Sequence, residues 1–170
     1  MICLSFLGVF RKKTRPSEIG PYLTDFVIRP LSHHRSHPDL WHLEGLSPEA
    51  LFEELFYLES FAVDYAVTLA LGHSPRRQAV MGHFWNVLRR RMAEMGCPFA
   101  LREYGPRQEA YREGIASHHS DPVAGVGSAF ASLCGLDGEE ALTEQAVTEF
   151  ATTATAIVKL LMRFRVLEEA

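Results

Sequence analysis

The stretch that decides the fold is residues 47–72, "SPEALFEELFYLESFAVDYAVTLALG". It begins with Ser47, whose hydroxyl can accept a hydrogen bond from a free N–H group of a first helical turn, and with Pro48, whose fixed φ suits that turn. Gly72 is a natural terminator, because many helices end in a glycine with a left-handed backbone. The pattern predicts one helix over 48–71, about 36 Å long at 1.5 Å per residue.

This helix is apolar over most of its circumference. Its polar positions follow steps of three and four and form one narrow stripe: Glu53, Tyr57, Ser60, Asp64 and Thr68. A helix of this kind lies at the centre of a bundle or within an oligomer. We expect Asp64 to face solvent with the stripe. The alternatives are a buried Asp64 paired with an arginine such as Arg77 or with a tyrosine hydroxyl, and a functional acid, because an unpaired buried carboxylate is costly.

The rest of the chain repeats the same helix signals. Further helices are predicted over about 18–29, 75–95, 107–117, 122–134 and 139–168. The first of them should end before Pro30, which leaves 30–46 as a loop. Strand signals are almost absent. We therefore predict an all-α, single-domain bundle of five or six helices over residues 1–170, with long helices near 48–71 and 139–168.

The helix expected at 122–134 is rich in small residues, with "VAGVGSAFASLC" at 123–134. Glycine inside a helix costs on the order of 1 kcal/mol relative to alanine. The compensating gain is the close approach of another backbone, so we expect tight helix packing here. A ligand slot beside this helix is the second interpretation.

Composition narrows the class of protein. The chain has 170 residues, 47% of them hydrophobic and 22% charged, with a net charge of −4. These values fit one folded domain and do not favour nucleic acid as a partner. The chain has three cysteines, Cys3, Cys97 and Cys134. Because their number is odd and they form no CxxC pair, they favour a reducing, cytoplasmic location. The basic residues gather in short runs: Arg11-Lys12-Lys13, Arg89-Arg90-Arg91 and Arg163/Arg165.

The first residues, "MICLSFLGVFRKK", place an apolar run before a basic one. A signal peptide has the opposite order, and the apolar run is too short to span a bilayer. We expect residues 1–16 to form a flexible or docking segment that folds back onto the core. Contact of residues 1–13 with a membrane surface is the alternative.

Histidines are crowded in "HHRSHPDLWH", residues 33–42, and recur at His118 and His119. His33 and His37 have the spacing at which two imidazoles face one way on a helix, but Pro30 and Pro38 bracket them. Zinc needs at least three protein ligands, and neither HExxH nor Glu-x-x-His is present. We expect an ordered polar loop, with no metal and no cofactor. His33, His37, His118 and His119 are the candidate ligands if a metal binds, and a proton switch is a further alternative.

No catalytic motif is evident: the chain has neither a GxSxG elbow nor a phosphate loop. We expect a non-catalytic helical interaction module that acts through self-association, as a homo-oligomer, or through a protein partner. A small-molecule or metal-binding bundle, or an enzyme, that uses the His-rich loop is the second hypothesis. A peripheral membrane adaptor that uses residues 1–13 is the third.

Overall fold

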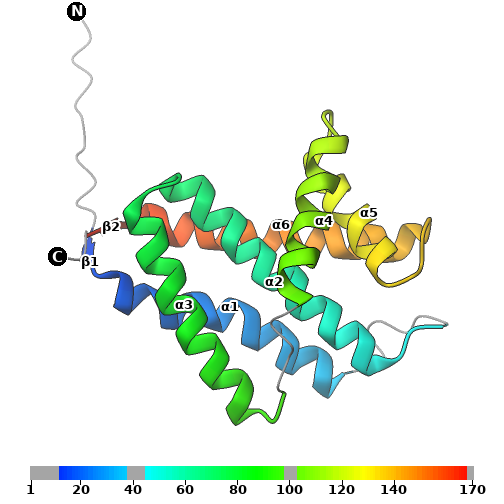
Figure 1. The fold of residues 1–170 in the computed structure, drawn as a ribbon, viewed down its shortest axis with the longest axis horizontal. Coiled ribbons are helices and arrows are strands. Elements are labelled where there is room, and N and C mark those ends of the chain that lie inside the picture. Colours follow the sequence, from blue (N-terminus) through cyan, green and yellow to red (C-terminus); the bar gives the residue numbers. More distant parts are fainter. Residues whose placement is uncertain (1–11, 38–44, 98–102, 168–170) are drawn as a thin grey trace, which may run out of the picture.

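A computed structural model describes residues 12–37, 45–97 and 103–167 of the chain. The described residues form six helices and one pair of short strands (Figure 1). The helices are α1 (Pro16–Ser36), α2 (Pro48–Leu71), α3 (Pro75–Glu94), α4 (Tyr104–Ser117), α5 (Pro122–Leu133) and α6 (Glu140–Met162), and the strands are β1 (Lys12–Thr14) and β2 (Phe164–Val166). The expected all-α bundle with a long helix at 48–71 is confirmed.

Side-chain caps begin α2, α3 and α5, and Ser47 is the cap that the sequence predicts for α2. Ser47 accepts a hydrogen bond from the Ala50 N–H at 3.1 Å, and Asp121 accepts one from the Ala124 N–H at 3.1 Å. Ser74 caps α3 in the same way. These bonds satisfy N–H groups that a first turn otherwise leaves free.

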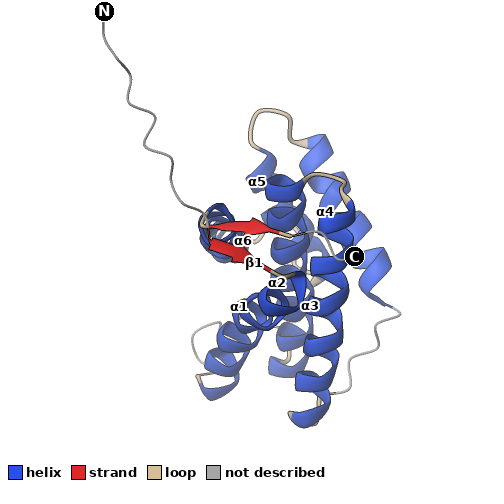
Figure 2. Ribbon diagram, turned by 90° about the vertical axis from the view of Figure 1, so that its left-hand side faces the viewer, coloured by secondary structure: helices blue, strands red, loops and turns tan. Residues whose placement is uncertain are grey.

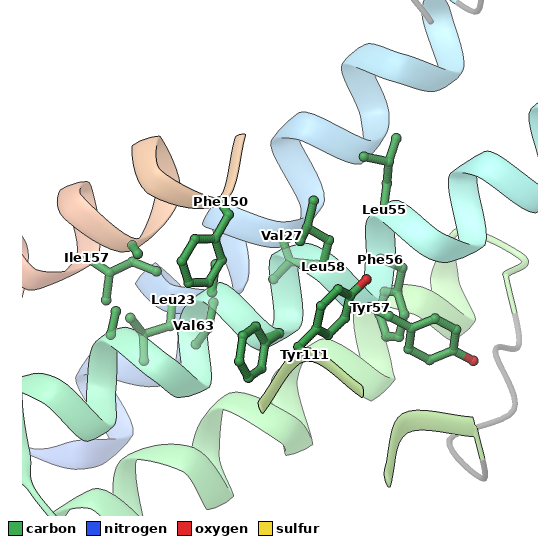
Figure 3. Packing of buried hydrophobic residues seen from close by; sticks show 14 of the residues in the cluster. Leu23, Val27, Leu55, Phe56, Tyr57, Leu58, Val63, Tyr111, Phe150 and Ile157 are labelled. Carbon is green, nitrogen blue, oxygen red and sulfur yellow. The ribbon is translucent and has the colours of Figure 1, made fainter. Parts of the chain in front are cut away.

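α2 runs through the centre of the molecule and packs chiefly against α6 and α1. α3 lies along α1, and α4 and α5 form a hairpin that packs on α6 and α2. At the centre, the Phe61 ring of α2 stacks between Tyr111 of α4 at 5.0 Å and Phe150 of α6 at 5.7 Å. Figure 3 shows Tyr111 and Phe150 within this buried cluster. The aromatic side chains of three helices therefore share one core.

The expected end of the first helix is wrong, because α1 continues through Pro30 to Ser36. A proline inside a helix removes a hydrogen bond and costs about 3 kcal/mol. The apolar face offsets this cost, since Ile19, Leu23, Val27 and Leu31 follow at steps of four and all four are fully buried. Burial of Leu31 beyond the proline keeps the helix intact.

The predicted end of the last helix is also wrong, because α6 stops at Met162 and residues 164–166 are extended. They pair in parallel with residues 12–14, in the register Lys12↔Phe164, Lys13↔Arg165 and Thr14↔Val166. Thr14 and Val166 are buried under this two-stranded ribbon. Residues 1–11, to which most of the docking expectation applies, lie outside the described part.

The small residues of α5 serve close packing, as predicted. A Cβ atom placed on Gly125 would lie 2.0 Å from the Gly114 carbonyl oxygen of α4. One placed on Gly127 would lie 2.6 Å from the Thr143 carbonyl oxygen of α6. Two neighbouring backbones therefore approach α5 more closely than any side chain would allow.

Candidate functional site

The β1–β2 ribbon joins two basic runs that are about 150 residues apart in the sequence. Lys13 and Arg165 are register partners, and paired residues of neighbouring strands project from the same face of a sheet. The exposed cations on and beside the two strands are Lys12, Lys13, Arg15, Arg163 and Arg165. We call these five residues the basic end. None of them forms an ion pair with another described residue.

Three well-exposed apolar side chains belong to helices that begin or end near the ribbon. Among the described residues, the exposed large hydrophobic side chains are Tyr22 (56%), Leu69 (66%) and Met162 (58%). α1 begins, and α2 and α6 end, on the side where the ribbon lies (Figures 1 and 2). Met162 directly precedes Arg163, so apolar and basic groups alternate along the chain there. Sequence reasoning missed these three residues, because it could not distinguish exposed from covered positions near helix ends.

The histidines do not meet at one centre. His33 and His37 lie in and after the last turn of α1, not in a loop, with ring centroids 4.6 Å apart. His118 follows α4, where its Nδ1 lies 3.1 Å from the Gly114 carbonyl oxygen, and His119 is exposed beside it. These two positions lie far apart in Figure 1. Across residues 12–37, 45–97 and 103–167, no three His, Cys, Asp or Glu side chains are arranged to hold a metal ion.

The polar stripe of α2 faces the interior, so the expectation of an exposed Asp64 is wrong. Asp64 is 8% exposed. Its carboxylate accepts hydrogen bonds from Arg77 Nη2 at 2.5 Å and from Arg112 Nη2 at 3.4 Å. Arg77 also donates to the Thr68 hydroxyl at 2.7 Å. The alternative of a buried ion pair with Arg77 is confirmed, because α3 and α4 cover a surface that was expected to face solvent.

A second polar group is buried between α2 and α4. The Glu54 carboxylate meets Arg107 at 2.6 Å, and the Arg107 guanidinium also lies over the Tyr57 ring. Burial raises the pKa of Glu54 to about 7, although Arg107 acts in the opposite direction. Burial likewise raises the pKa of the Cys134 thiol to about 12, so this thiol stays protonated and is a poor nucleophile.

Glu59 is the most deeply buried acid of the described chain, with no exposed surface. Burial raises its pKa to about 8, with a smaller lowering effect from the Thr153 hydroxyl and a raising effect from Glu149. Glu149 of α6 lies 3.8 Å from the His34 Nε2 of α1. The sequence did contain a signal for Glu54 and Glu59, because both depart from the polar stripe of α2.

Comparison with known proteins finds no family model, no curated protein and no solved structure that matches this chain. Within the part that the structure describes, no helix is both long and apolar enough to cross a membrane.

Proposed function

We propose that this protein is a non-catalytic interaction module that docks its basic end onto an anionic membrane surface. The observation that carries the proposal is the register pair Lys13↔Arg165, which places cations from two distant runs side by side. Like charges at paired positions of a sheet repel each other. A row of lipid phosphates or carboxylates relieves that repulsion.

Peripheral membrane binding needs more than one attractive term. Each basic residue near an anionic surface contributes about 1 kcal/mol, and apolar groups at the same end add insertion energy. The basic end supplies five cations, and Tyr22, Leu69 and Met162 supply exposed apolar surface. In the sequence, the apolar residues Phe6, Leu7, Val9 and Phe10 come shortly before β1. The cytoplasmic leaflet is the anionic one, which agrees with the location that the cysteines favour.

Co-sedimentation of the full chain with vesicles tests the proposal. The protein should sediment with phosphatidylcholine vesicles that contain phosphatidylserine, and should stay in solution with phosphatidylcholine alone. The double variant Lys13→Gln/Arg165→Gln should weaken binding about 30-fold, because two cations of about 1 kcal/mol each are lost. Added salt should weaken the binding of the parent protein.

The matched control is Arg89→Gln/Arg90→Gln. It removes the same charge from exposed positions in the last turns of α3, whose end points away from the ribbon (Figure 1). This control should bind vesicles like the parent. Equal binding to neutral vesicles, or equal losses in both double variants, would contradict the proposal.

Self-association and a protein partner remain the competing expectation. They were motivated by the apolar surface of α2 and α6, and the structure covers most of that surface within the chain. An acidic protein could still occupy the basic end. Failure to bind either kind of vesicle would favour that partner over a membrane.

A further inference from the structure

A group of buried polar atoms between α2 and α4 lacks partners. Gln108 is 2% exposed and Tyr111 is fully buried. Among the described residues, five polar atoms of this group have no hydrogen-bond partner: Glu54 Oε2, Arg107 Nε, Gln108 Oε1, Gln108 Nε2 and Tyr111 Oη. Buried polar groups are nearly always hydrogen-bonded, so a concentration of exceptions calls for a molecule that completes them.

The unpartnered atoms come from neighbouring positions. Residues 107, 108 and 111 lie on adjacent rows of α4, since residues three and four apart share a face of a helix. Arg107 Nη2 contacts Glu54 Oε1 at 2.6 Å. The second hydrogen bond that an arginine and a carboxylate can form, here from Arg107 Nε to Glu54 Oε2, is absent. The charges of Glu54, Arg107 and Cys134 all affect the pKa of the Tyr111 phenol, so the phenol lies near these three groups.

We propose that Arg107, Gln108 and Tyr111 of α4, together with Glu54 of α2, bind the carboxyl group of a small carboxylic acid with an apolar remainder. Arg107 Nε, Gln108 Nε2 and Tyr111 Oη are donors, and a carboxylate accepts about four hydrogen bonds, whereas Gln108 Oε1 is an acceptor that the carboxylate leaves unpaired. Arginine recognises a carboxylate with its planar fork. This proposal is independent of membrane binding.

The surroundings explain why the remainder of the ligand is apolar. The Tyr111 ring stacks on Phe61 at 5.0 Å and belongs to the same buried cluster as Phe56 and Leu58 (Figure 3). A polar or sugar-like remainder would lose its hydration there without gaining partners. Arg107 has 25% of its side chain exposed, so the charged edge of the site reaches solvent.

Binding should require protonated Glu54, so it should take up a proton above about pH 7. With Glu54 ionised, the carboxylate of the ligand would meet a second carboxylate, whereas protonated Glu54 donates its O–H to the ligand and leaves the Arg107 charge to balance it. The ionisable groups that act on this site are Glu53, Glu54 and Tyr57 of α2, Glu103, Arg107 and Tyr111 at and in α4, and Cys134 after α5. Because the pKa of Glu54 is raised to about 7, affinity should fall as the pH rises through 7.

Titration calorimetry of the full chain with sodium octanoate tests the site at pH 6 and pH 8, where octanoate is ionised throughout. One octanoate should bind per chain, and more tightly at pH 6. Tyr111→Phe removes a single unpartnered hydroxyl, so it should fold normally and weaken binding about tenfold. Tyr104→Phe, the same change near the start of α4, and Lys13→Gln/Arg165→Gln at the basic end should bind octanoate like the parent.

Three results would overturn the proposal. They are an absence of binding heat at pH 6, equal affinity at the two pH values, and unchanged affinity in Tyr111→Phe. Absence of binding heat would mean that water alone supplies hydrogen-bond partners to the five atoms. Weakened octanoate binding in the Lys13→Gln/Arg165→Gln variant would place the ligand at the basic end instead.

Discussion

Glu59 shows what one buried acid does to stability. Its pKa is raised from 4.5 to about 8. The unfolded chain therefore loses this proton first, and between about pH 4.5 and pH 8 the folded state binds more protons than the unfolded state. The free energy of unfolding falls as the pH rises through this window. Glu54 contributes in the same direction up to about pH 7.

Glu59→Gln should flatten this dependence. At pH 5 a protonated glutamate and a glutamine are both neutral, so the two proteins should differ little in stability. At pH 8 the variant should be more stable by about 2–4 kcal/mol, because it avoids a buried charge. Urea unfolding at several pH values measures the difference. Glu144→Gln, at an exposed site on α6, is the control and should follow the parent profile. Parallel profiles for Glu59→Gln and the parent would show that Glu59 does not titrate in this window.

Asp64 is also a buried acid, but its carboxylate is paired with arginine side chains. Among the described residues, Arg77→Ala leaves the carboxylate with Arg112 as its ion-pair partner, which is 52% exposed, and the substitution should cost about 2–3 kcal/mol. Arg112→Ala should cost less than 1 kcal/mol, because exposed pairs contribute little. Denaturant midpoints of the two variants give the comparison. Equal losses would mean that Asp64 does not depend chiefly on Arg77.

At the scale of elements, glycine has two different roles in these helices. A Cβ on Gly125 would collide with the backbone of α4, whereas one on Gly82 of α3 meets nothing within 4 Å. Gly82→Ala should therefore stabilise the protein by about 0.5–1 kcal/mol through helix propensity. Gly125→Ala should destabilise it by about 2 kcal/mol or more, because α4 and α5 must separate. Thermal unfolding of the two variants tests the contrast, and a shift of the same sign in both would refute close packing.

The helix boundaries show how much of this fold the sequence predicts. The starts of α2, α3 and α5 were predicted well, because Ser47, Ser74 and Asp121 cap them through local hydrogen bonds, whereas α1 and α4, which have no side-chain cap, begin two and three residues before their predicted starts. Helix ends were predicted less well, since Pro30 and the segment after Met162 are decided by tertiary burial. The ribbon was missed because three-residue strands are too short to show an alternating pattern.

The interior of the candidate sites was harder to predict for a related reason. Periodicity indicates that polar residues of α2 share a face, but it does not say whether another polar helix covers that face. The arginines that cover Glu54 and Asp64 lie on α4 and α3, in segments that look like ordinary solvated helices. Only their packing against α2 makes Arg77 and Arg107 structural partners.

At the scale of the whole molecule, the net charge of −4 conceals an uneven distribution. The parallel pairing of β1 and β2 gathers five cations at one end. A two-stranded sheet is marginal by itself, so its buried side must secure it to the bundle. That side carries Thr14 and Val166, while Lys13 and Arg165 lie outward. At the pairs Thr14–Val166 and Lys13–Arg165, the ribbon thus separates a stabilising face from a binding face.

Aspartate substitutions at two adjacent positions can separate the roles of these two faces. Val166→Asp places a charge at a position that is 5% exposed and should lower the free energy of unfolding by about 3 kcal/mol or more. For a chain of this size that loss corresponds to a fall in melting temperature of about 6–12 °C. Arg165→Asp, one residue earlier and exposed, should change the melting temperature little and still weaken binding to anionic vesicles more than tenfold, because one cation becomes an anion. Calorimetry and co-sedimentation on both variants give the two readouts. The contrary result is a loss of vesicle binding only in the variant whose melting temperature falls, with no effect of the change of charge at position 165. That result would mean that the ribbon has only a structural role.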